Sequence, residues 1–142
     1  MDLNRNKIIK ILFTSVGRRV ELIQAFRKAA DSARTKLFIY GADLSASAPA
    51  MFFCDKKVIA PAIKDDNYIP FLEEFCKNEQ ITAIIPTIDT DLLILAHNKE
   101  KFESSGTRVV VSAPDKVAVC RDKRITYDFF TECGLKSPEP VT

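Results

Sequence analysis

The chain has 142 residues, a length that suits one domain with a substantial hydrophobic core. Its composition, 46% hydrophobic and 28% charged, excludes extended disorder. The formal net charge is +2 and basic residues are dispersed among acidic ones, so we expect no nucleic-acid partner and no membrane partner. The four cysteines are far apart and form no Cys-x-x-Cys pair, and the amino-terminal apolar stretch is too short for a membrane span. These features predict a cytoplasmic protein with reduced thiols and no metal site.

Apolar runs alternate with amphipathic segments along the chain. The runs predict strands at residues 8–13, 36–42, 57–60, 81–85 and 109–111, and the amphipathic segments predict helices at 20–30, 68–78 and 90–105. Strands and helices that alternate at this spacing are joined by right-handed crossovers. The sequence therefore predicts an α/β fold, a Rossmann-like doubly wound parallel sheet of about five strands. A further helix is expected from residue 123 to Cys133, ended by Gly134, before an extended tail.

The turn after the first predicted strand has residue types that suit a ligand site. Ser15, Gly17, Arg18 and Arg19 form a polar cluster there. Gly17 lets the backbone turn tightly, the amides at the start of the following helix would face an anion, and Arg18 or Arg19 would add a charge-assisted contact. The turn lacks the triple-glycine spacing of dinucleotide-binding proteins, which weighs against a nicotinamide cofactor. The alternative is that both arginines are solvated, because arginine at a helix amino terminus opposes the helix dipole.

Polar residues also follow two other predicted strands. Asp43 stands where dinucleotide enzymes place a ribose-binding carboxylate, although Asp-x-Ser is also common turn chemistry. Thr87, Asp89 and Asp91 lie between a strand and a helix, where capping accounts for one or two of the polar groups. Because the carboxyl ends of parallel strands converge, we expect these residues to line a substrate site together with those of the first turn. No nucleophile with an adjacent base is evident, so no catalytic residue is predicted.

Three ordered motifs resemble the amino-terminal part of ATP-grasp enzymes, of the carbamoyl phosphate synthase large-subunit-like group. The motifs are Thr14 to Glu21, Pro86 to Leu92, and the Asp122-Lys123 pair before a helix that ends in Gly134. The resemblance implies a pre-ATP-grasp domain at residues 1–121 and the start of an ATP-grasp domain at 122–142. It implies that Lys123 reaches the phosphates of ATP. A solvated lysine near a helix start is the alternative.

The resemblance also implies a carboxylate–amine ligase that acts through an acyl phosphate. Its cofactors would be ATP and Mg²⁺, held mainly by a carboxyl-terminal ATP-grasp domain in the same or a split chain. The phosphate loop and the magnesium carboxylates of such enzymes are not among these residues, so we expect this chain alone to be inactive and to bind no cofactor tightly. The alternative is a stand-alone Rossmann-like module that binds a small anionic or nucleotide ligand. The ligase interpretation predicts a poorly covered helix at 123–133, or one buried against a second copy in a homodimer.

Overall fold

The computed structural model describes residues 8–140. Its centre is a five-stranded, all-parallel sheet in the order β3-β2-β1-β4-β5, which confirms the predicted α/β fold. The strands are β1 (Ile9–Thr14), β2 (Leu37–Asp43), β3 (Lys56–Ile59), β4 (Ala83–Pro86) and β5 (Arg108–Val109). Strand β1 lies between β2 and β4, as expected for an apolar run buried on both faces. The turn that follows β1 therefore starts at the middle of the sheet's carboxyl edge.

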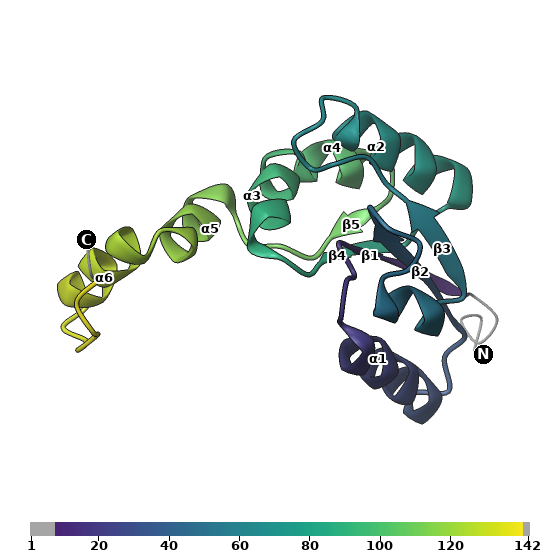
Figure 1. Ribbon diagram of the computed structural model, residues 1–142, viewed down its shortest axis with the longest axis horizontal. Coiled ribbons are helices and arrows are strands. Elements are labelled where there is room, and N and C mark those ends of the chain that lie inside the picture. The colour runs from purple at the N-terminus through teal and green to yellow at the C-terminus, as the bar shows by residue number, and fades with distance from the viewer. Residues whose placement is uncertain (1–7, 141–142) are drawn as a thin grey trace, which may run out of the picture.

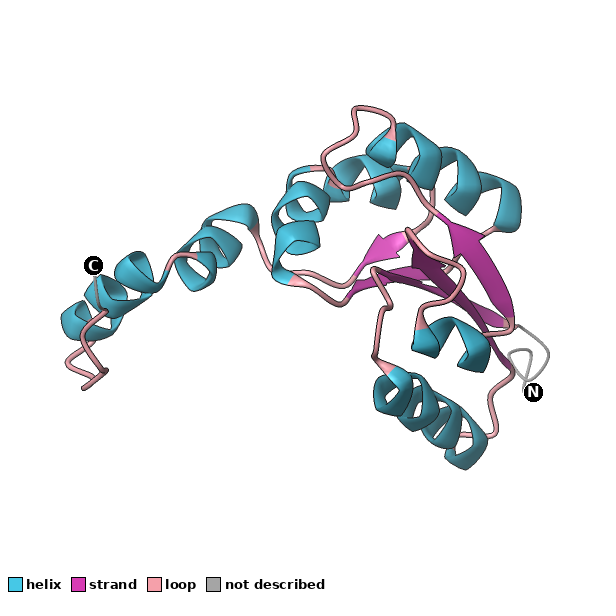
Figure 2. Cartoon of the chain, in the orientation of Figure 1, coloured by secondary structure: helices cyan, strands magenta, loops and turns pink. Residues whose placement is uncertain are grey.

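Helices cover both faces of the sheet (Figures 1 and 2). The helix α1 (Val20–Ser32) and the short 3₁₀ helix η1 (Pro49–Phe53) lie on one face. The opposite face carries α2 (Tyr68–Glu79), α3 (Asp89–His97) and α4 (Lys99–Ser104). The chain continues into α5 (Pro114–Arg121) and α6 (Lys123–Glu132).

The alternation of side chains along the strands divides the core into two layers. Ile11 and Phe13 of β1 pack with Ile23 of α1 and Met51 of η1. Leu12, one residue away on the same strand, points to the other face and joins the cluster under α2, α3 and α4. Both layers are buried, and this burial is the main stabilising contribution to the fold.

The structure differs from the predicted elements in the second half of the chain. The predicted helix at 90–105 is two helices, α3 and α4, which meet at Asn98. The Asn98 side-chain amide donates to the carbonyl of Ile94 at 2.8 Å, so an asparagine ends one helix and begins the next. Strand β5 is also shorter than the predicted 109–111, and neither η1 nor α5 was predicted.

The helices α5 and α6 form an arm that extends away from the sheet (Figure 1). Helix α5 packs on α3, whereas α6 packs on α5. Helix α6 has no buried residue, and Ile125 and Phe129 on it are 47% and 44% exposed. Its start is capped by Asp122, whose carboxylate accepts a hydrogen bond from the Arg124 backbone at 2.9 Å. Over residues 8–140, no helix has the length and apolarity that crossing a membrane requires.

Candidate functional site

The turn after β1 has an unusual backbone. Ser15 and Gly17 have φ angles of +52° and +45°, in the left-handed region that favours glycine. Two hydrogen bonds fix this turn from neighbouring segments: the amide of Val16 donates to Ala42 O at 3.0 Å, and the amide of Ala50 donates to Gly17 O at 3.0 Å. The turn is thus held against both β2 and η1.

Asp43, at the end of β2, fastens the same turn with its side chain. Its Oδ2 accepts the amide of Gly17 at 2.8 Å and its Oδ1 accepts the amide of Ser45 at 3.2 Å. Asp43 therefore makes the local hydrogen bond that an Asp-x-Ser turn is expected to make, to the amide two residues later. Since a carboxylate of the protein occupies the Gly17 amide, this amide is not free to bind the anionic ligand that the sequence suggested. A polar group that approaches Gly17 meets a negative charge.

A cavity of about 310 Å³ opens beside this turn. Its polar lining comes from Ser15, Gly17 and Asp43. The rest of the lining is apolar or aromatic and comes from Ala42, Leu44, Ala60, Pro61, Ile63, Tyr68 and Ile88. Such a cavity suits a small ligand whose apolar part lies against the walls and whose hydrogen-bond donors face Asp43 and Ser15.

Asp91, in the first turn of α3, lies behind the cavity wall. Its side chain is 0% exposed. Its Oδ1 accepts the hydroxyl of Tyr68 at 2.7 Å, and its Oδ2 accepts that of Ser15 at 3.4 Å. Burial raises the pKa of Asp91, and the hydroxyls of Thr14, Tyr68 and Ser15 oppose that rise. The Thr14 hydroxyl is close enough to act on this charge but completes no hydrogen bond of good geometry with any described residue.

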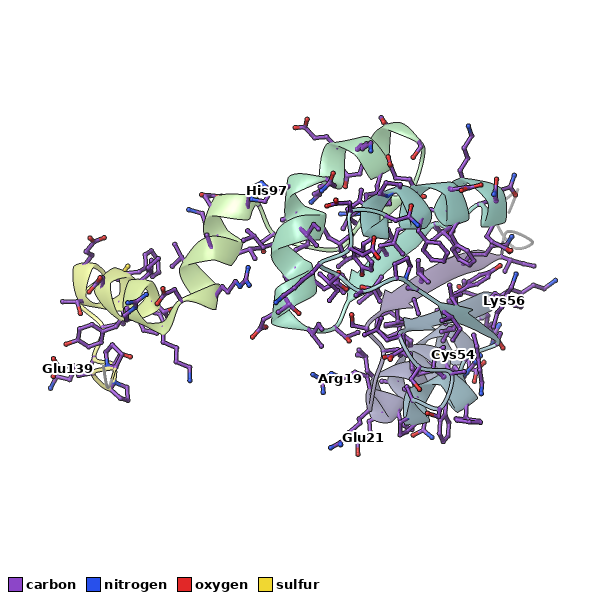
Figure 3. All side chains as sticks on the ribbon, turned by 45° about the horizontal axis from the view of Figure 1, so that its top comes forward. Arg19, Glu21, Cys54, Lys56, His97 and Glu139 are labelled. Carbon is purple, nitrogen blue, oxygen red and sulfur yellow. The ribbon has the colours of Figure 1, made fainter. Side chains whose placement is uncertain are left out.

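Thr87 and Arg19 connect the turn to the end of β4. The hydroxyl of Thr87 lies 2.6 Å from Ser15 O and 3.1 Å from Thr14 O, so it donates to the backbone of the turn. One guanidinium nitrogen of Arg19 donates to Thr87 O at 3.3 Å. Arg19 otherwise lies at the margin of the domain, where its side chain is exposed (Figure 3).

The remaining predicted residues lie elsewhere. Asp89 lines a separate cleft of about 310 Å³ with Ser112, Lys116 and Arg121 and with apolar residues of α3, α5 and the segment after β5. Arg18 is exposed and does not line the cavity beside Gly17. Lys123 is exposed at the start of α6, on the arm. The structure thus gathers Ser15, Gly17, Asp43, Thr87, Asp91 and Arg19 around one turn, and it leaves Asp89, Arg18 and Lys123 outside that group.

Sequence reasoning missed the part that Tyr68 plays in the cavity. Tyr68 is 2% exposed, is one of the residues that line the cavity and donates its hydroxyl to Asp91. Its helical spacing with Leu72 predicts only a core position. A tyrosine at a buried helix start was the available signal, because a buried tyrosine hydroxyl usually needs a hydrogen-bond partner.

The fold and the position of this cavity define a class of protein. A parallel sheet of order 3-2-1-4-5 with its cavity at the carboxyl edge is a Rossmann-like domain of the pre-ATP-grasp type. The chain belongs to the family described as "PylC-like, N-terminal domain", whose model matches residues 11–110. A search of curated proteins gives no match.

Solved structures share the fold at low sequence identity. N5-carboxyaminoimidazole ribonucleotide synthetase from Thermotoga maritima is 17% identical with a TM-score of 0.61, and the match covers 92% of this chain and 32% of that one. The N5-carboxyaminoimidazole synthetase from Staphylococcus aureus, solved with ADP, is 12% identical with a TM-score of 0.60 over 93% of this chain and 32% of that one. The biotin carboxylase domain of Hydrogenobacter thermophilus 2-oxoglutarate carboxylase, solved with MgADP and bicarbonate, is 12% identical with a TM-score of 0.57 over 91% and 28%. The chain spans about a third of the length of these proteins.

Proposed function

We propose that this chain is the substrate-binding domain of an ATP-grasp ligase that joins a carboxylate to an amine through an acyl phosphate. The observation that carries the proposal is the cavity at the carboxyl edge, where Ser15, Gly17 and Asp43 present polar groups beside an apolar wall. Within this proposal, Ser15 and Asp43 contact the substrate, because both line the cavity. The match to a family described as an N-terminal domain supports the proposal, because such a domain acts with further sequence.

Exposed apolar side chains on the arm are evidence for a partner domain. Ile125, Phe129 and Leu135 are 47%, 44% and 58% exposed. Ile125 and Phe129 are four residues apart on α6 and so lie on one face of it, and apolar side chains exposed together are usually covered in a complete protein. We propose that the ATP-grasp domain, in the same chain or in a split partner, covers α6 and that Lys123 then reaches the phosphates of ATP. The exposed face would equally suit a second copy of this chain, so a homodimer is the other arrangement that the proposal allows.

ATP and Mg²⁺ would be held by that second domain. Phosphoryl transfer needs metal and phosphate clamps placed around the transferred group, so the residues of this chain bind and orient a substrate and do not transfer phosphate by themselves. Two more specific parts of the proposal are that the reaction resembles that of carbamoyl phosphate synthase and that the protein is cytoplasmic. The similar proteins of known structure are a synthetase and a carboxylase, and the reaction of this chain is a proposal.

Amide chemical-shift mapping of this chain by NMR tests the proposal. Small carboxylates and amines, including amino acids, are titrated first, and Mg-ATP is titrated in a separate sample. The proposal predicts that at least one carboxylate or amine shifts the amides of Ser15, Gly17 and Asp43. It predicts that Mg-ATP at the same concentrations leaves them unchanged.

If the chain is instead a stand-alone binding module, the opposite pattern of amide shifts is expected. If Mg-ATP or another nucleotide shifted the amides around Gly17 and carboxylates and amines did not, the cavity would be a nucleotide site and the ligase proposal would be wrong.

A further inference from the structure

Two walls of the cavity come from segments that are distant in the sequence and meet at one buried carboxylate. Ser15 belongs to the turn after β1, and Tyr68 is the first residue of α2. Both residues line the cavity, and both hydroxyls donate to Asp91, from Ser15 at 3.4 Å and from Tyr68 at 2.7 Å. Asp91 therefore bridges the turn and the helix from behind.

The turn needs such support because its backbone is strained. A non-glycine residue such as Ser15 is sterically disfavoured at a φ of +52° relative to an ordinary conformation. Surrounding contacts must hold it there. The Thr87 hydroxyl, which lies 2.6 Å from Ser15 O, holds the backbone carbonyl of Ser15, and Asp91 holds the Ser15 hydroxyl.

Asp91 is badly placed to contact a ligand itself. It is 0% exposed, it is absent from the cavity lining, and each of its oxygens already accepts a hydroxyl. A charge buried in this way is costly unless it is hydrogen-bonded, so the pairing with Tyr68 and Ser15 is also what lets the carboxylate stay there.

We infer that Asp91 is a positioning residue, which acts through Ser15 and Tyr68 to fix the two walls of the cavity before a ligand arrives. The substrate role of the cavity rests on the proposed function above. Tyr68 then contributes to specificity, because it lines the cavity while its hydroxyl is held by Asp91. Loss of the bridge should release both walls together, although neither residue is a neighbour of the other in sequence.

Amide hydrogen exchange measured by NMR on the full chain without ligand tests this inference. The amides of Val16 and Gly17 report on the turn, because they are bonded to Ala42 O and Asp43 Oδ2. In Tyr68→Phe and Asp91→Ala, exchange at these two amides should rise about tenfold, while amides of β4 keep their wild-type rates. Asp91→Asn should restore slow exchange, since its amide oxygen can accept from Tyr68 and its NH₂ group can donate to Ser15.

A second tyrosine provides the matched control. Tyr40 also donates its hydroxyl to a carboxylate, that of Glu79 at 2.8 Å, and does not line the cavity. Tyr40→Phe should leave exchange at Val16 and Gly17 at the wild-type rate. Unchanged exchange at these amides in Tyr68→Phe, or an equal rise in Tyr40→Phe, would overturn the inference. If Asp91→Ala fails to fold, Tyr68→Phe decides alone. Because no ligand is present, the result is independent of the titrations that test the proposed function.

Discussion

Gly41, in the middle of β2, should be intolerant of a side chain. A Cβ atom placed there would lie 2.6 Å from Sγ of Cys54 and 3.3 Å from Sδ of Met51. Real Cβ atoms do not approach a sulfur that closely, so in Gly41→Ala either the Cys54 side chain rotates away or the segment that carries it moves away from the sheet. A movement of η1 would reach the candidate site, because the amide of Ala50 in η1 donates to Gly17 O at 3.0 Å.

The cost can be bounded from the geometry. Inserting one methyl group into a packed interior costs about 1 to 3 kcal/mol, and we expect a value in the middle of this range because β2 is paired on both sides and cannot shift, whereas the Cys54 side chain can. Cys54→Ala removes the sulfur that makes the shortest contact. The loss of unfolding free energy in the double variant Gly41→Ala with Cys54→Ala should therefore be smaller than the sum of the two single losses, by about 1 kcal/mol or more.

Urea unfolding followed by circular dichroism measures the four free energies of unfolding in this cycle. We expect Gly41→Ala to lower the free energy of unfolding by about 2 kcal/mol and the added Cys54→Ala to recover part of it. If the two losses were strictly additive, or if Gly41→Ala were as stable as the wild type, the close approach of η1 to β2 would not be what requires glycine.

Three further predictions concern the site and the arm. Gly17→Ala should lower the free energy of unfolding by about 1 kcal/mol through its φ of +45° alone, because the added Cβ meets nothing closer than 3.6 Å; urea unfolding measures it, and a loss of several kcal/mol would mean a steric clash instead. Burial raises the pKa of Asp91, so the folded chain holds this proton more tightly than the unfolded chain. The stability of wild type relative to Asp91→Asn should therefore increase as the pH falls from the raised pKa toward the unfolded value of about 4, as seen in urea midpoints at several pH values; the opposite slope would mean that the carboxylate is stabilised by its partners. Deleting residues 122–142 should change the free energy of unfolding of the sheet domain by less than about 0.5 kcal/mol, because α6 has no buried residue; a large drop in the thermal midpoint would instead favour the stand-alone module.

The sheet was predictable because its signal is local and repeated. A continuous apolar run such as that of β1 indicates a strand buried on both faces, and strand–helix alternation then restricts the topology to parallel crossovers. The same reasoning failed over residues 90–105, where apolar spacing continues through Asn98 and only its side-chain bond to Ile94 O marks the break. The length of β5 was overestimated, because the apolar residues that follow it, Val110 and Val111, lie beyond the residues that pair with β4.

The candidate site was predictable only as a set of residues at strand ends. That Ser15, Gly17 and Asp43 would line one cavity follows from the convergence of parallel strands. Which group faces the ligand and which lies behind it could not be predicted, because it depends on side-chain directions set by distant packing. Asp91 and Asp89 are two residues apart, yet one is buried against Tyr68 and the other lines a different cleft.

The central claim is that this chain is one domain of an ATP-grasp ligase, and the sequence of its gene beyond the codon for Thr142 tests it most directly. The account predicts that the reading frame, or an adjacent gene, encodes a further domain of roughly 150 to 200 residues with a glycine-rich loop and paired acidic residues for Mg²⁺. A stop codon at that position with no such domain encoded nearby would contradict the account and leave a small-ligand binding module.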